Sequence, residues 1–171
     1  MRLILFAFLL LAGRLQAQPA RPLSEEARRV NLETQVTALE QAFLKEDFEA
    51  YADRLHPDVV RLAGGPDALA AKLRKSLEQM SAQGSELLGV SHGAPSRLVS
   101  VDRELQCTLP QTMEFQKAGA TRRLQSTLLA VSRDGGLTWM FFDTAGRDWE
   151  AVRRLLPSLS RDIVLPAPGN N

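Results

Sequence analysis

The sequence predicts a single α+β domain in which helices pack on one face of a curved, mainly antiparallel sheet. Apolar residues recur at helical spacing through the first half of the chain, whereas strand-like runs separated by Gly, Pro and Asp fill most of the second half. At 171 residues, with 44% hydrophobic and 24% charged residues, the chain has the composition of one globular domain.

The first residues have the pattern of a secretory signal peptide. Arg2 precedes an apolar run from Leu3 to Gly13, and Ala17 is a small residue at which cleavage is expected. The run is too short to cross a bilayer comfortably, and Arg14 stands where a lipid anchor would require a cysteine. We therefore expect a secreted or periplasmic protein without a membrane anchor. Its expected parts are a signal peptide over 1–17, a linker and helix start over 18–29, the folded domain over 30–159 and a tail over 160–171.

Charge and cysteine content exclude several classes of function. Without Arg2 and Arg14, 19 basic residues face 20 acidic ones with their signs interspersed, which gives no electrostatic reason to expect nucleic acid or membrane partners. Cys107 is the only cysteine, so no intramolecular disulfide forms. We expect it to be a buried, inert strand thiol rather than a reactive or dimer-bridging one. One cysteine and two histidines make no recognisable zinc set, and we expect neither a metal nor a cofactor.

The helical half divides into three expected helices. Ser24 is the expected N-cap of a long first helix that ends near Glu46, and Asp47 is the expected cap of a short second helix. The stretch "HPDVVRLAGG" then suits a short strand, because the residue before a proline favours extended geometry and two valines follow. Pro66 is expected at the first position of a third helix that stops near Gly84.

The second half of the chain predicts strands and one closing helix. Asp134-Gly135 predicts a tight hairpin, and Pro110 predicts a bulge, a bend or an edge position within its strand. A short amphipathic helix follows in "RDWEAVRRLLPSL", and the tail is expected to be ordered around "DIVL". The expected strands are "SELLGVSHG", "SRLVSVD", "ELQCTLPQTMEFQ", "TRRLQSTLLAVS" and "LTWMFFDT".

This order of elements, with "FLKEDFEAYADRLHPDVVRLAGG", resembles the NTF2-like (SnoaL-like) superfamily. More narrowly, "LQCTLPQTMEF" followed by "STLLAVSRDGGLTWMFFDTAG" is similar to a group of secreted bacterial NTF2-like proteins, over Asn31 to Leu159. The resemblance implies a cone of three N-terminal helices on a curved sheet, with a short C-terminal helix. It leaves function open, because the fold carries isomerases, dehydratases and cyclases as well as noncatalytic proteins. No catalytic residue of those enzymes matches this chain by motif.

His56 and Asp58 are the first candidate pair for a site. Two residues apart in a strand, they would share one face, where a carboxylate could polarise the histidine as a general base. The structural alternative, which we favour, is that His56 caps the second helix and Asp58 bonds to backbone in the turn.

The remaining candidates also have a functional and a structural interpretation. Tyr51 could reach the interior of the cone, although core packing is favoured, and Asp143 could sit at a pocket mouth, although a turn cap is favoured. His92 is expected to be an exposed loop histidine. Gln111, Glu114 and Arg123 lie on the two longest strands and could line the interior or pair across strands, and pairing on a solvated face is favoured for all three.

Trp139 is the last candidate, in an apolar run without alternation. Both faces of that strand need cover, which the C-terminal helix or a second copy of the chain, paired sheet to sheet, could provide. The favoured function is noncatalytic binding of a small apolar ligand or a protein partner, because neither a nucleophile motif nor a phosphate loop is visible. An acid–base enzyme using Tyr51, His56, Asp58 or Asp143 is the alternative, and a scaffold or dimeric interaction module is a third.

Overall fold

Five helices and five strands make up an α+β domain in the computed structural model, which describes residues 22–144 and 147–163. The expected signal peptide lies outside these residues. None of the helices within the described ranges is long and apolar enough to cross a membrane. The helices are α1 (Glu25–Leu44), α2 (Phe48–Ala52), α3 (Pro57–Ala63), α4 (Pro66–Ala82) and α5 (Trp149–Leu155).

The expected caps of the N-terminal helices are confirmed. The Ser24 hydroxyl accepts a hydrogen bond from the Ala27 N–H and begins α1, and the Asp47 carboxylate accepts one from the Ala50 N–H and begins α2. Pro66 occupies the first turn of α4, where its missing N–H costs nothing. Local signals therefore set the starts of these three helices.

The short strand expected after His56 is wrong, because that segment is the helix α3. Pro57 occupies the first turn, and the His56 side chain caps it by accepting from the Asp58 N–H. Gly64 ends the helix in the left-handed region at φ 95°, which favours glycine. These start and stop signals outweigh the strand preference of two valines, so four helices precede the sheet instead of three.

The sheet has the expected antiparallel character. Its main order is β1-β3-β4-β5, with β2 pairing to β3 beyond the end of β1. The long strands β3 and β4 pair without interruption from Leu105–Ser132 to Lys117–Ala120. The strands are β1 (Ser85–His92), β2 (Val99–Val101), β3 (Glu104–Lys117), β4 (Ala120–Ser132) and β5 (Met140–Asp143).

One expectation about the sheet is wrong, and one is confirmed. The tight hairpin at Asp134-Gly135 is a wider loop between β4 and β5, because the Asp134 carboxylate gathers the N–H groups of Leu137 and Thr138 into a larger turn. Pro110 pairs with Thr127 in regular register, and the irregularity lies in β1 near Leu88. On the side away from β4, β1 has ended and β2 has not begun, so Pro110 has the edge position that was one of its expected alternatives.

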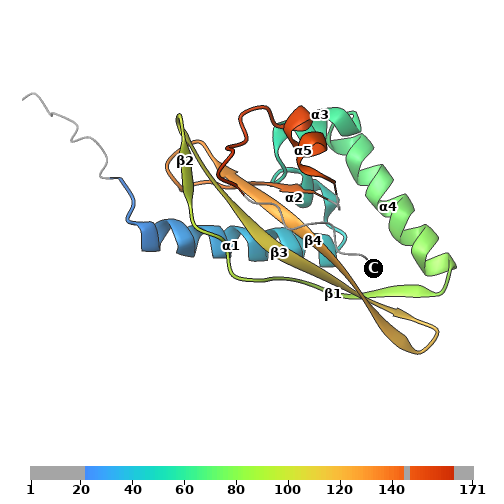
Figure 1. Cartoon of the computed structure of the whole chain (residues 1–171). Coiled ribbons are helices and arrows are strands. Elements are labelled where there is room, and N and C mark those ends of the chain that lie inside the picture. The colour runs from blue at the N-terminus through green and yellow to red at the C-terminus, as the bar shows by residue number, and fades with distance from the viewer. Residues whose placement is uncertain (1–21, 145–146, 164–171) are drawn as a thin grey trace, which may run out of the picture.

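The two faces of the sheet are covered by different elements. In Figure 1, α1 crosses the inner parts of β3 and β4, and the far ends of both strands project beyond the helices. We call the face toward α1 and α2 the concave face; its side chains include Cys107 and Leu109 of β3 and Leu128 of β4. On the opposite face, Leu129 and Phe142 pack with Val152 of α5, so the C-terminal helix, one of the two alternatives, covers this face.

The C-terminal segment is fastened to that opposite face. The fully buried Gln106 side chain accepts from the Ser160 N–H and donates to the Ser158 carbonyl. Ile163 is buried with Leu159 in the same cluster, so the described part of the tail packs as ordered structure. The amide N–H and the amide oxygen of Gln106 each bond to the backbone of the C-terminal segment. These two bonds attach the segment to the sheet, although its described part forms no strand.

Candidate functional site

The concave face divides into an inner part that is fully packed and an outer part that is only half covered. In the inner part Cys107, Leu109 and Leu128 have 0% exposure, beneath α1 and α2. Beyond Gln111, side chains on the same face become half-buried or exposed, and Leu124 is 47% exposed. A change from closed to partly open packing along a single face makes the outer part a candidate binding surface.

We define the outer concave patch as the five apolar side chains on this face beyond Gln111. The register places Val90 opposite Met113, Met113 opposite Leu124, and Leu87 opposite Phe115. The intervening β3 residues Thr112, Glu114 and Gln116 point to the other face, as strand alternation requires. The patch therefore consists of Leu87, Val90, Met113, Phe115 and Leu124.

Gln111 marks the boundary between the packed and the open part. Its side chain is 4% exposed, and its Oε1 atom has no hydrogen-bond donor among the described residues. Its cross-strand neighbours are His92 on β1 and Ser126 on β4. A buried amide oxygen without a partner costs about 1–3 kcal/mol, so this position favours a donor supplied from outside the chain.

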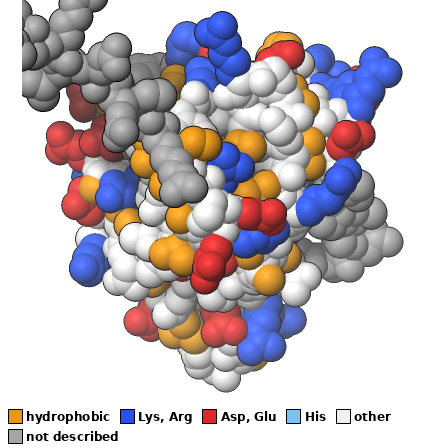
Figure 2. Space-filling view, turned by 90° about the vertical axis from the view of Figure 1, so that its left-hand side faces the viewer, with side chains coloured by type: hydrophobic (Ala, Val, Ile, Leu, Met, Phe, Trp, Pro, Cys, Tyr) orange, Lys and Arg blue, Asp and Glu red, His pale blue; other side chains and the backbone are white. Residues whose placement is uncertain are grey.

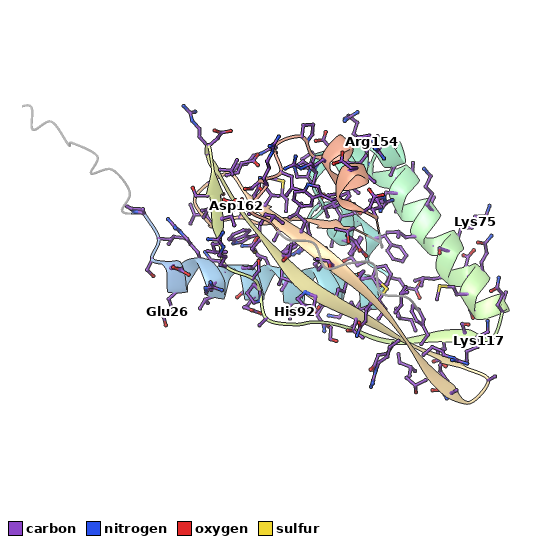
Figure 3. All side chains as sticks on the ribbon, viewed as in Figure 1. Glu26, Lys75, His92, Lys117, Arg154 and Asp162 are labelled. Carbon is purple, nitrogen blue, oxygen red and sulfur yellow. The ribbon has the colours of Figure 1, made fainter. Side chains whose placement is uncertain are left out.

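His92 forms the most connected polar cluster on this side, and the expectation of an exposed loop histidine is wrong. It is the last residue of β1, its side chain is 14% exposed, and Figure 3 labels it beside α1. Its Nδ1 lies 2.7 Å from Glu40 Oε1, and its Nε2 lies 2.7 Å from Glu33 Oε2. The three side chains join α1 to β1; we call them the His92 clasp.

The clasp favours the charged form of its histidine. Burial alone would lower the pKa of His92, but hydrogen bonds to Glu33 and Glu40, together with their charges, raise it above its usual value. A neutral imidazole has a single N–H and could donate to one carboxylate only, whereas an imidazolium donates to both. Since both ring nitrogens are engaged, His92 acts here as a brace rather than as a free base.

Tyr51 and Asp143 are brought near each other, and Tyr51 serves the core. Tyr51 is 8% exposed, and its ring packs on Phe43 with centroids 5.2 Å apart. Burial, followed by the negative charge of Asp143, raises the pKa of Tyr51. A tyrosine held this firmly in its neutral form donates its proton poorly, which supports the favoured packing role. Asp143 is half-buried at the end of β5, on the concave face opposite Leu128.

His56 and Asp58 belong to the start of α3. His56 is 2% exposed, and its Nδ1 accepts from the Asp58 N–H at 3.3 Å. The Asp58 carboxylate is held by Arg61 at 3.0 Å, with its other oxygen 3.7 Å from His56 Nδ1. Burial, followed by the charge of Arg133, lowers the pKa of His56. The expectation that His56 caps the second helix is therefore wrong, because His56 caps the start of α3, and the Asp58 carboxylate pairs with Arg61 instead of with backbone.

The remaining candidates have structural roles. Trp139 and Cys107 are core residues, and Glu114 forms an ion pair with Arg123. Trp139 is 2% exposed within the concave core, and its backbone N–H donates to Gln35 Oε1. Burial raises the pKa of the Cys107 thiol to about 12. The cross-strand pair is confirmed, since Arg123 Nε lies 2.7 Å from Glu114 Oε1 on the polar face.

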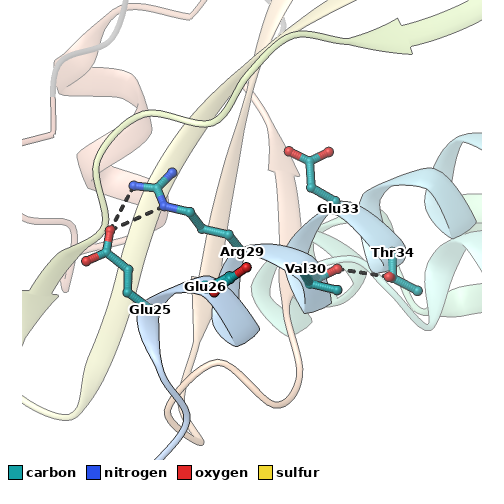
Figure 4. Close-up of a pocket in the computed structure, with 6 residues that line it drawn as sticks. All are labelled: Glu25, Glu26, Arg29, Val30, Glu33 and Thr34. Carbon is teal, nitrogen blue, oxygen red and sulfur yellow. Dashed lines mark hydrogen bonds and ion pairs between the residues drawn. The ribbon is translucent and has the colours of Figure 1, made fainter.

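An open groove of about 520 Å³ runs along the first turns of α1. Figure 4 shows the residues that line it, among which Arg29 is paired to Glu25 at 3.1 Å. Glu33 belongs both to this groove and to the His92 clasp. The groove is lined by Glu25, Glu26, Arg29, Val30, Glu33 and Thr34.

Sequence reasoning missed Glu33 and Glu40. They lie seven residues apart on α1 and so share one side of the helix, but nothing local indicates that His92 meets them. The usable signal is that Glu40 interrupts the apolar side of an otherwise regular helix.

The molecular surface agrees with the expected charge balance, since Figure 2 shows acidic, basic and hydrophobic side chains interspersed on the face in view.

Comparisons with known proteins give structural similarity only. No family model matches the sequence, and no curated protein matches it. A solved structure of Aln2 from a Streptomyces species is 15% identical, covers 78% of this chain and 99% of its own, and has a TM-score of 0.49. A structure from Catenulispora acidiphila in complex with S-DNPA is 14% identical, covers 70% and 93%, and has a TM-score of 0.49. TsrD from Streptomyces laurentii is 17% identical, covers 77% and 98%, and has a TM-score of 0.36.

Proposed function

We propose that the chain is an exported NTF2-like domain that binds a small apolar ligand on the outer concave patch without catalysing a reaction. The observation that carries this proposal is the patch itself, in which apolar side chains from three strands meet on one face and remain half-covered. Export rests on the signal-peptide pattern of residues 1–17.

The chemistry of the patch suits an apolar molecule. Glu114 and Arg123 pair with each other on the opposite face, and Arg122, the cross-strand partner of Phe115, is the charged residue of β4 at the outer edge of the patch. Val90 and Leu87 also pack against the main core cluster, which gives the patch a firm base. Contact of an apolar ligand with such a surface is favourable by about 25 cal/mol per Å² of apolar area removed from water.

The polar residues support binding more than catalysis. His56 is used to cap α3, both nitrogens of His92 are used in the clasp, and burial keeps Tyr51 neutral. An acid–base reaction needs a group that is free to exchange a proton with the substrate. The enzyme alternative with Tyr51, His56, Asp58 and Asp143 gains no support, because the Asp58 carboxylate is paired with Arg61, His56 Nδ1 caps α3 and burial keeps Tyr51 neutral.

The test is ligand retention by the whole protein. Protein purified from its native host is denatured, and the extract is examined by mass spectrometry for the wild type, Leu124→Glu and Leu62→Glu. Leu62, on α3, is a matched control because it is 55% exposed and Leu124 is 47% exposed. We expect an apolar small molecule in near-equal molar amount from the wild type and the control, and its loss from Leu124→Glu.

Two results would contradict the proposal. One is a wild-type extract without any stoichiometric small molecule, and the other is equal retention by Leu124→Glu. Sedimentation of the same samples tests the alternative that a second copy of the chain occupies the patch. A wild-type dimer that Leu124→Glu converts to a monomer would assign the patch to self-association instead.

A further inference from the structure

We infer that Gln111 selects a ligand that carries a hydroxyl or another hydrogen-bond donor beside its apolar body, and that Gln111 Oε1 accepts that hydrogen bond. This inference rests on the proposed function, because it specifies the chemistry of the molecule that occupies the outer concave patch.

Gln111 Oε1 is a buried acceptor without a donor among the described residues. Gln111 is 4% exposed, so water reaches it poorly, yet Oε1 receives no hydrogen bond from any described residue. Buried polar atoms in folded proteins nearly always have a partner, and an exception calls for an explanation such as a ligand, an ion or a water. Five such atoms occur among the described residues, and Gln111 Oε1 is the only one of them on β1, β3 or β4, the strands that form the patch. An amide oxygen accepts hydrogen bonds only, which excludes a bare ether or a ketone as the group that completes it.

His92 and Ser126 flank Gln111 across the neighbouring strands, and neither donates to its Oε1. His92 is its register partner on β1, but its Nδ1 is bonded to Glu40 and its Nε2 to Glu33. The clasp thus holds the adjacent donor away from Gln111 and leaves the oxygen available.

The apolar surroundings fix the rest of the ligand. On the outer side of Gln111, the next residue of β3 on the same face is Met113, which lies between Val90 and Leu124 in the register. On the inner side lies Leu109, which is fully buried. A donor at Gln111 therefore directs the body of the ligand outward, over Met113, and such a molecule is a small apolar alcohol or phenol.

The test uses two probes that differ in one group, 2-naphthol and 2-methoxynaphthalene. Both have the same apolar rings, but only 2-naphthol donates a hydrogen bond, and the ether is the more hydrophobic of the two. Affinities are measured by probe fluorescence with the full mature chain. A hydrogen bond to a buried acceptor, worth about 1–1.5 kcal/mol, corresponds to roughly tenfold tighter binding of 2-naphthol by the wild type.

Two variants test whether the preference for 2-naphthol depends on Gln111 or on any glutamine of β3. Gln111→Met keeps the side-chain length and removes the acceptor, so the preference should fall from about tenfold to none. Gln116→Met is the matched control, because it makes the same change in β3 on the opposite face, and it should keep the preference.

The outcomes distinguish the two proposals. Binding of both probes with equal affinity, or a preference that persists in Gln111→Met, overturns the inference and leaves the apolar patch intact. Failure of the wild type to bind either probe overturns the proposed function and the inference with it. The comparison of the two probes on the wild type needs no variant, so a Gln111→Met protein that does not fold would not remove the test.

Discussion

The inner and the outer parts of the concave face are built from the same two long strands, but their side chains differ in how deeply they are buried. Cys107 and Leu128 in the inner part are fully buried, whereas Leu124, four residues before Leu128 on the same face, is 47% exposed. The strands alternate in the same way throughout, so the difference comes from the helices that cover them. Strand pattern decides which face is apolar, and tertiary packing decides how much of that face remains available for a ligand.

Thiol reactivity should show the largest contrast between the two parts. The pKa of Cys107 is raised to about 12, and a free thiol has a pKa near 8.5, so at pH 8 its thiolate fraction is roughly a thousandfold smaller. A cysteine introduced by Met113→Cys in a Cys107→Ala background should react with iodoacetamide like an ordinary half-exposed thiol. The measurement is the rate of alkylation followed by mass spectrometry. Fast modification of Cys107 in the folded wild type would contradict the description of a closed inner part.

Truncation of a leucine to alanine should lower the free energy of unfolding much more in the inner part than in the outer part. Leu128→Ala removes a fully buried side chain and should lower the free energy of unfolding by about 2–5 kcal/mol. Leu124→Ala should change it by no more than about 0.5 kcal/mol, because the side chain is nearly half exposed. Urea denaturation followed by circular dichroism measures both. Similar losses in the two variants would mean that the outer patch is part of the core.

The His92 clasp should contribute more than an exposed ion pair of the same sheet. His92→Leu leaves Glu40, which is 8% exposed, without its donor, and should cost about 1–3 kcal/mol. Arg123→Leu breaks the exposed pair with Glu114 and should cost less than about 1 kcal/mol. The measurement is again urea denaturation. An equal loss of unfolding free energy in Arg123→Leu and His92→Leu would contradict the prediction that the His92 clasp stabilises the fold more than an exposed ion pair does.

The two histidines should give opposite and smaller dependences of stability on pH. The pKa of His92 is raised on folding, so its contribution is complete below about pH 6.5 and is lost as the pH rises through its folded value. The pKa of His56 is lowered, so its contribution is complete above about pH 6.5 and is lost as the pH falls toward its folded value. His92→Leu should therefore remove a loss of stability on the alkaline side, and His56→Leu one on the acidic side. Unfolding free energies measured from pH 5 to 9 would contradict this if both variants changed the same side.

Much of the fold could be predicted from local signals. Ser24, Asp47 and Pro66 mark helix starts by short-range chemistry, and the strand stretches follow from alternation and turn residues. The error at α3 has the same local origin, because the strand preference of two valines competes there with a proline start and a glycine stop.

The candidate site could be predicted only in part. The sequence marks Gln111 as a residue that could line the interior, but its missing partner depends on what β1 and α1 place around it. His92 resembles a loop residue in the sequence, because Glu33 and Glu40 reach it across more than fifty positions. Contacts at that separation follow from the packing of α1 on the sheet, which no local pattern contains.

The most direct test of ligand binding on the outer concave patch is a map of methyl chemical shifts in the full mature chain during titration with 2-naphthol. The account predicts perturbations at Val90, Met113 and Leu124, and none at Leu62 on α3 or at Val30 in the groove of α1. Perturbations centred on Val30 or Leu62, or their absence from the patch at saturating probe, would contradict it.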